Sequence, residues 1–113
     1  MCERDWNYTD FDYYQDRTDE FAIYGENIFY PFLGLAEEAG EVCGKVAKHI
    51  RDTDPGELID RDMMAKELGD VLWMVAQCAK VLDLSLADIA KGNIEKLQSR
   101  KDRNVLKGSG DER

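Results

Sequence analysis

Basic residues are scarce in this chain of 113 residues. Fifteen lysines and arginines stand against 24 aspartates and glutamates, which gives a formal net charge of −9. A chain this acidic lacks the broad basic surface that binds duplex nucleic acid or an anionic membrane. We therefore expect no nucleic acid and no membrane as partner. A small phosphorylated ligand stays possible, because a bound metal ion can reverse the local sign of charge.

Cysteine, histidine and long hydrophobic runs are also few. Cys2, Cys43 and Cys78 form no C-x-x-C pair, and His49 is the single histidine. This composition gives little support to a zinc site or a nucleophile–histidine pair, and it favours reduced thiols in a cytoplasmic protein. No run is long enough to cross a bilayer, and the first residues lack the apolar core of a signal peptide.

Apolar residues at helical spacing dominate the rest of the sequence, and no segment alternates with the period of a strand. The pattern predicts one domain over residues 1–113, with flexible ends at 1–9 and 107–113. Helices are expected over about 10–24, 31–51, 58 or 60 to 82, and 86–100. Ser85, with Asp88 three residues later, predicts the N-cap of the last helix. The expected fold class is all-α, of the four-helix-bundle type.

Two acidic pairs lie within these apolar helices. Glu38 and Glu41 are three residues apart, with Glu37 beside them, and Glu67 and Asp70 repeat the spacing. On a helix this spacing places both carboxylates on one face. Buried carboxylates repel one another, so a hard divalent cation held by oxygen ligands is the simplest partner. A solvated acidic face is the alternative, and the pattern alone leaves both open.

Other residues near the acidic pairs have two possible roles each. Gly34 and Gly40 could allow close helix approach or leave room for a ligand. Trp73 is more often a core residue than a platform for a nucleobase. Asn93, Lys96 and Arg100 follow helical spacing and form a polar, basic stripe, or an ordinary solvated face. All-oxygen ligands, without a Glu-x-x-His motif of the iron type, favour Mg²⁺ or Mn²⁺.

The order LGLAEEAGEV, a loop, KELGDVLWMVAQCAKVL and then NIEKLQSR resembles the MazG-like nucleotide pyrophosphohydrolases, which belong to the all-α NTP pyrophosphatase superfamily. The family motif E-x-x-E, a spacer and E-x-x-D is filled by Glu38, Glu41, Glu67 and Asp70. Glu37 is the additional acid often found before the first pair. The resemblance covers about residues 14–113, including a Gly-Ser-Gly-Asp tail that ends in Arg113.

This resemblance implies hydrolysis of a nucleoside or deoxynucleoside triphosphate to the monophosphate and pyrophosphate. A metal-activated water would attack the α-phosphorus. It implies Mg²⁺, with Mn²⁺ as a possible substitute, held by Glu38, Glu41, Glu67 and Asp70. The catalytic carboxylates would come from the first acidic group. They are Glu37, Glu38 and Glu41, with Glu37 or Glu38 as the general base.

The expected substrate-binding residues are Asn93, Lys96, Arg100, Arg113 and Trp73. A homodimer or homotetramer is expected, because the third helix is apolar almost all round and the resemblance implies an oligomer. The expected location is the cytoplasm of a bacterium or of a phage-infected cell. The alternatives are a non-catalytic acidic helical oligomer that binds a metal–nucleotide or a protein partner, and a dUTPase-like enzyme with a narrow base choice.

Overall fold

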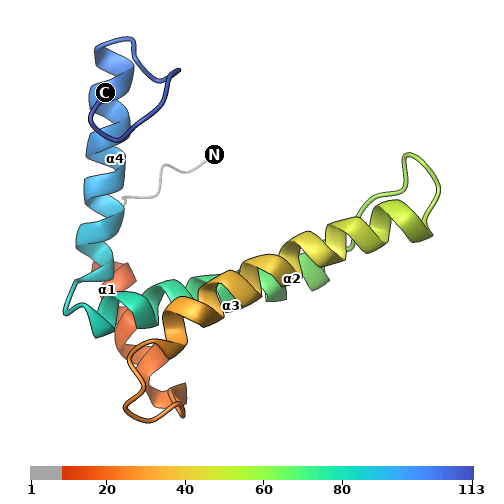
Figure 1. Cartoon of the computed structure of the whole chain (residues 1–113), viewed down its shortest axis with the longest axis horizontal. Helices are drawn as coiled ribbons and strands as arrows, with labels where there is room; N and C mark the ends of the chain where they lie inside the picture. Colours follow the sequence, from red (N-terminus) through yellow and green to blue (C-terminus); the bar gives the residue numbers. More distant parts are fainter. Residues whose placement is uncertain (1–8) are drawn as a thin grey trace.

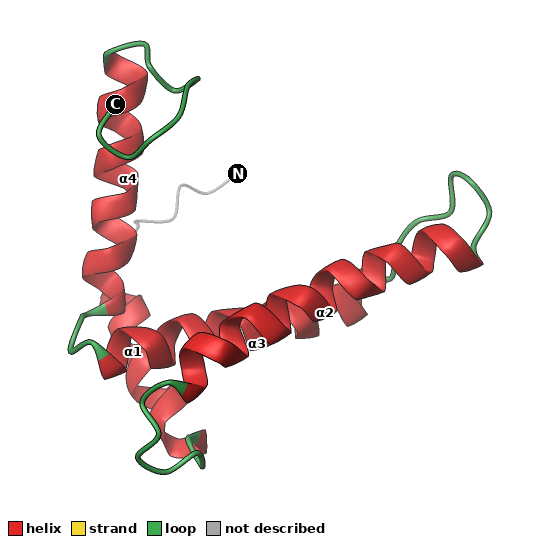
Figure 2. Cartoon of the chain, viewed as in Figure 1, coloured by secondary structure: helices red, strands yellow, loops and turns green. Residues whose placement is uncertain are grey.

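The computed structural model describes residues 9–113, and this part of the chain is helical with no strand (Figure 2). The expected all-α class is confirmed. Cys2 and nearly all of the start that we expected to be flexible lie outside the described residues. The elements are α1 (Thr9–Thr18), a short 3-10 helix η1 (Asp19–Phe21), α2 (Tyr30–Asp52), α3 (Arg61–Val81) and α4 (Leu86–Asp102).

The first helix is shorter than its apolar pattern predicts. Helix α1 ends at Thr18, and the chain tightens into η1 before it becomes extended at Ala22. Phe21 and Ile23, which fall within the helix predicted over about 10–24, are both exposed. The prediction of a helix to residue 24 was therefore wrong, because contacts to α3 hold Thr18 at the end of the helix.

Helices α2 and α3 form a long antiparallel pair (Figure 1). Pro31 occupies the first turn of α2, where its missing N–H costs nothing. Asp60 caps α3 by accepting a hydrogen bond of 3.1 Å from the backbone N–H of Met63. A Cβ at Gly34 would lie 2.6 Å from the Sδ of Met74, so this glycine serves close approach of the two helices. The first and last residues of α2 and α3 thus agree closely with the predicted ranges.

A buried glutamine fixes α1 and η1 against α3. Gln77 is fully buried; its amide donates to the Thr18 hydroxyl over 2.8 Å, and its carbonyl oxygen accepts from the Tyr24 hydroxyl over 2.6 Å. Trp73, one turn earlier on α3, donates its indole N–H to the Thr18 carbonyl over 3.2 Å. Because buried polar groups need partners, this network sets one register for the start of the chain.

Helix α4 packs on α1 and points away from the α2–α3 pair (Figure 1). The Asp12 carboxylate accepts hydrogen bonds from the Ser85 hydroxyl and the Ala87 N–H, which attaches the start of α4 to α1. The Ser85 side chain also accepts from the Asp88 N–H over 3.2 Å, as the sequence predicts for the N-cap. The predicted bundle is therefore not closed within one chain. The Cα radius of gyration is 17.2 Å, against about 13 Å for a compact domain of this length.

Burial is concentrated where the second half of α3 and the start of α4 each pack on α1, and where the start of α2, with buried Pro31 and Gly34, packs on α3. On α3 and α4 the buried apolar residues lie in the second half of α3 and the start of α4; they are Met74, Ala76, Cys78, Ala79, Leu86 and Ala87. Leu68 and Leu72, in the first half of α3, are exposed because α4 does not cover them. The prediction that α3 is buried on nearly every side therefore holds only for its second half. None of the described helices combines the length and hydropathy of a membrane span.

Candidate functional site

Three acidic side chains converge between α2 and α3. Glu38 projects from α2, and Glu67 and Asp70 project from α3, so that one carboxylate oxygen of each lies within 4.8 Å of the others. We call this group the acidic cluster. The structure thus brings together three of the four predicted metal ligands. Glu41 lies one turn along α2 and is not part of the cluster.

The cluster is electrostatically unfavourable without a cation. Partial burial, together with the neighbouring charges of Glu41, Asp70, Glu37 and Glu67, raises the pKa of Glu38 above its ordinary value. The Oε2 atom of Glu67 is buried and has no hydrogen-bond partner within the described residues. A buried carboxylate oxygen without a donor is costly, so the site has an unused position for a positive group.

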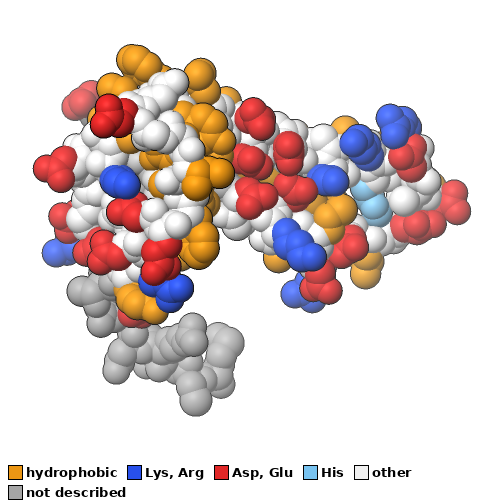
Figure 3. All heavy atoms as spheres, turned by 90° about the horizontal axis from the view of Figure 1, so that it is seen from below, with side chains coloured by type: hydrophobic (Ala, Val, Ile, Leu, Met, Phe, Trp, Pro, Cys, Tyr) orange, Lys and Arg blue, Asp and Glu red, His pale blue; other side chains and the backbone are white. Residues whose placement is uncertain are grey.

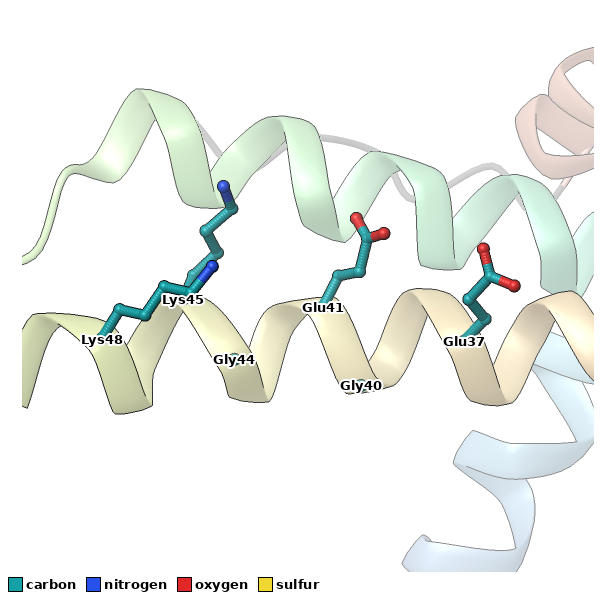
Figure 4. A pocket seen from close by; sticks show the side chains of 6 residues that line it. All are labelled: Glu37, Gly40, Glu41, Gly44, Lys45 and Lys48. Atoms are coloured by element: carbon teal, nitrogen blue, oxygen red, sulfur yellow. The ribbon is translucent and has the colours of Figure 1, made fainter.

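A groove runs along α2 next to the acidic cluster (Figure 4). Its volume is about 410 Å³, and it is lined by Glu37, Gly40, Glu41, Gly44, Lys45 and Lys48. Glu37, Glu41 and Lys45 project from α2 toward α3, and Lys48 extends along α2 toward Lys45 (Figure 4). A Cβ at Gly40 would meet no atom within 4 Å, so this glycine leaves open space and does not serve close helix packing.

Lys45 and Lys48 are site residues that the sequence analysis missed. The Lys45 Nζ lies 3.9 Å from Oε1 of Glu67. The available signal was the spacing of positions 38, 41, 45 and 48, which recurs every three or four residues and therefore lies on one helix face.

The predicted basic stripe on α4 does not reach the acidic cluster within one chain. Asn93 is exposed on a helix that leaves the α2–α3 pair (Figure 1). Lys96 and Arg100 instead contact the tail, with their nitrogens 3.5 Å and 3.2 Å from Oδ1 of Asp111. Arg100 is buried, and these two cations lower the pKa of Asp111. In a single chain, the stripe is therefore occupied by the protein's own carboxylate.

Arg113 holds the same tail against the end of α4. Its guanidinium donates to the carbonyl oxygens of Val105, Leu106 and Gly110 over 3.1, 3.2 and 2.6 Å. Arg103 in turn donates to the carbonyl oxygen of Arg113 over 2.8 Å. The segment that the sequence predicts to be flexible thus returns to the helix in the structure, and the Arg113 side chain is used for this contact.

Comparison with known proteins shows the family of this chain. Residues 32–105 match the model of the MazG nucleotide pyrophosphohydrolase domain. The chain belongs to the MazG family. The matched MazG region includes both acidic pairs and the groove. The chain is also similar to the Gene 37 protein of Mycobacterium phage L5, with 46% identity over 112 residues that cover 90% of this chain and 97% of that protein. No solved structure matches the chain significantly.

The MazG family is generally dependent on divalent metal ions, and the acidic cluster has the donors for one. Carboxylate oxygens from two helices are the ligands that hard cations prefer. The unpartnered Oε2 of Glu67 offers a position that such a cation would satisfy. The residues of the acidic cluster therefore fit a divalent metal ion.

Trp73 lies between α1 and α3 in this MazG chain. Its indole N–H is used by the Thr18 carbonyl, and its ring packs edge-to-face on Tyr24 with centroids 6.3 Å apart. Tyr24 also stacks on Tyr30 at 4.9 Å. These contacts favour the core role of Trp73 over the role of a nucleobase platform.

Proposed function

We propose that this MazG-family chain hydrolyses nucleoside or deoxynucleoside triphosphates to the monophosphate and pyrophosphate, with Mg²⁺ as cofactor and Mn²⁺ as a substitute. The observation that carries the proposal is the convergence of Glu38, Glu67 and Asp70 from two helices around a buried, unpartnered carboxylate oxygen. If these acids served only in structural salt bridges, each would have a basic partner. Within residues 9–113, neither Glu38 nor Asp70 has an ion pair.

Glu38, Glu67 and Asp70 would hold the ion, with Glu41 as the fourth ligand after a turn of its side chain toward the cluster. When bound, the ion would neutralise phosphate charge and increase the acidity of a water. The acidic side chains alone would repel a triphosphate, so the substrate is expected to bind as its metal complex.

Glu37 is the proposed general base, with Glu38 as the alternative. Glu38 belongs to the acidic cluster, whereas Glu37 lines the groove and has no ion pair within the described residues. Glu37 would accept a proton from water as the water oxygen bonds to the α-phosphorus. The bond from this phosphorus to the bridging oxygen breaks, and pyrophosphate leaves with the bonding electrons.

We further propose that the active form is a homodimer or homotetramer. Large apolar side chains on α1, α2, α3 and α4 are exposed in the single chain. Figure 3 shows a band of hydrophobic side chains beside a group of acidic ones. The exposed apolar residues include Phe29, Leu33, Leu68 and Ile94. Contiguous exposed apolar surface of this kind favours association with a second copy of the chain.

The site of action proposed for the enzyme is the cytoplasm of a bacterium or of a phage-infected cell, where nucleotide pools are found. The similar phage protein supports this proposal.

The test of the function is a product analysis with each common NTP and dNTP, with Mg²⁺ and with a chelator. We expect monophosphate and pyrophosphate, and no reaction after chelation. Diphosphate and phosphate would refute the proposed bond choice, and no product from any nucleotide would favour a binding role.

A further inference from the structure

Lys45 lines the groove and also lies next to the acidic cluster. Within residues 9–113 it is the basic side chain that forms an ion pair with the acidic cluster, at 3.9 Å from Oε1 of Glu67. That distance is too long for a hydrogen bond. The Oε2 atom of Glu67 stays unpartnered, so Lys45 does not complete the bonding of this carboxylate. The ammonium group is therefore near the cluster without being fixed there.

We propose that Lys45 binds the pyrophosphate portion of the substrate and serves as a temporary counter-charge to Glu67 when the metal is absent. The proposal rests on the proposed function, because it assigns the substrate's leaving group to one end of the same groove. A cation bound at the cluster would repel the Lys45 ammonium and neutralise Glu67. The flexible stem of Lys45 then allows its head to turn along the groove.

The order of charge along the groove gives the substrate a direction. Glu37 and Glu41 lie at one end, and Lys45 and Lys48 lie at the other (Figure 4). Four residues, or about 6 Å of helix axis, separate Glu41 from Lys45. The metal-bound phosphates would sit at the acidic end. The terminal phosphates would extend toward the lysines, where their charge is neutralised as pyrophosphate departs.

The groove has the space that this arrangement needs. A Cβ at either Gly40 or Gly44 would meet no atom within 4 Å, so the groove is open beside Glu41 at the acidic end and again between Glu41 and Lys45. The other predicted phosphate ligands, Lys96 and Arg100, are paired with Asp111 on a helix that points away. Lys45 thus supplies a cation at the site from the same helix as the proposed base.

The test is a calorimetric titration of the full chain with Mg²⁺ alone and with inorganic pyrophosphate in the presence of Mg²⁺. Lys45→Gln should weaken pyrophosphate binding about tenfold or more, while Mg²⁺ alone binds as tightly as in the wild type or more tightly. Lys45→Met, which keeps the apolar stem, is the second variant. Lys45→Arg should bind pyrophosphate within about threefold of the wild type, because it keeps the charge.

Lys91→Gln is the matched control, because it removes the same charge from an exposed pair with Glu95 on α4. It should leave pyrophosphate binding unchanged. The assignment is overturned if Lys45→Gln and Lys45→Met bind pyrophosphate as the wild type does, if they lose Mg²⁺ affinity, or if the wild type binds no pyrophosphate. A wild type that binds pyrophosphate through Lys45 but hydrolyses no triphosphate would refute the proposed function alone.

Discussion

Glu38 on α2 and Asp70 on α3 bring carboxylate oxygens within 4.8 Å of each other from two antiparallel helices. Their repulsion contributes to the raised pKa of Glu38. A fold that holds like charges together in this way gives up stability, which is common where a site is built for a cation. This relationship underlies the first two predictions.

Replacing Asp70 with Asn should stabilise the metal-free protein and strongly reduce activity. The substitution removes one of the charges that disfavour ionised Glu38, so Tm in the presence of chelator should rise. Activity with Mg²⁺ should fall about 10²-fold or more, because a proposed metal ligand is lost. Thermal denaturation and a product assay check both effects. Glu26→Gln, at an exposed position outside the site, should change neither.

Mg²⁺ should stabilise the wild-type protein and should do so much less in Glu67→Gln. An ion that binds only the folded state at ten times its Kd adds about 1.4 kcal/mol to the free energy of unfolding. Denaturant unfolding with Mg²⁺ and with chelator measures this difference. Equal stabilisation of the wild type and Glu67→Gln would mean that the ion binds elsewhere.

Gly34 and Gly40 should respond in opposite directions to substitution by Ala. The Cβ at position 34 would lie 2.6 Å from the Sδ of buried Met74, so Gly34→Ala should cost about 1–3 kcal/mol in the free energy of unfolding. Gly40→Ala meets no atom within 4 Å and should gain up to about 1 kcal/mol from helix propensity. Chemical denaturation of the two variants compares them directly. Similar losses at both positions would contradict the helix packing described above.

The Asp111 contact should depend on pH below the ordinary pKa of 3.8. Arg100 and Lys96 lower the pKa of this carboxyl, so the folded state favours the charged form. The contribution is fully present above the ordinary pKa and is lost as pH falls through the lowered value. Carboxyl NMR titration measures the shift. At neutral pH, Asp111→Asn should speed amide exchange in residues 106–113, whereas Glu112→Gln should not.

Much of the local structure could be predicted because local signals determine it. Pro31, Asp60 and Ser85 mark the starts of three helices, and the i, i+3 spacing of the acidic pairs places them on helix faces. The family motif then predicts which faces meet. Glu38, Glu67 and Asp70 do lie together in the structure.

The direction of α4 could not be predicted from periodicity. Contacts such as Ser85 with Asp12 join residues that are far apart in the sequence, and nothing in either segment alone indicates the pairing. The occupation of Lys96 and Arg100 by Asp111 follows from the path of the tail, which composition predicts to be flexible. Lys45 was missed because its contact with Glu67 crosses to α3, which the sequence of α2 alone does not show.

The most direct test of the central claim is hydrolysis in ¹⁸O-labelled water, followed by mass spectrometry of the products. The substrates are the nucleoside triphosphates that the product assay identifies, supplied with Mg²⁺. Attack at the α-phosphorus places the label in the nucleoside monophosphate and none in pyrophosphate, and we predict this result for the wild type and its loss in Asp70→Asn. Label in pyrophosphate would place the attack at the β-phosphorus and contradict the account.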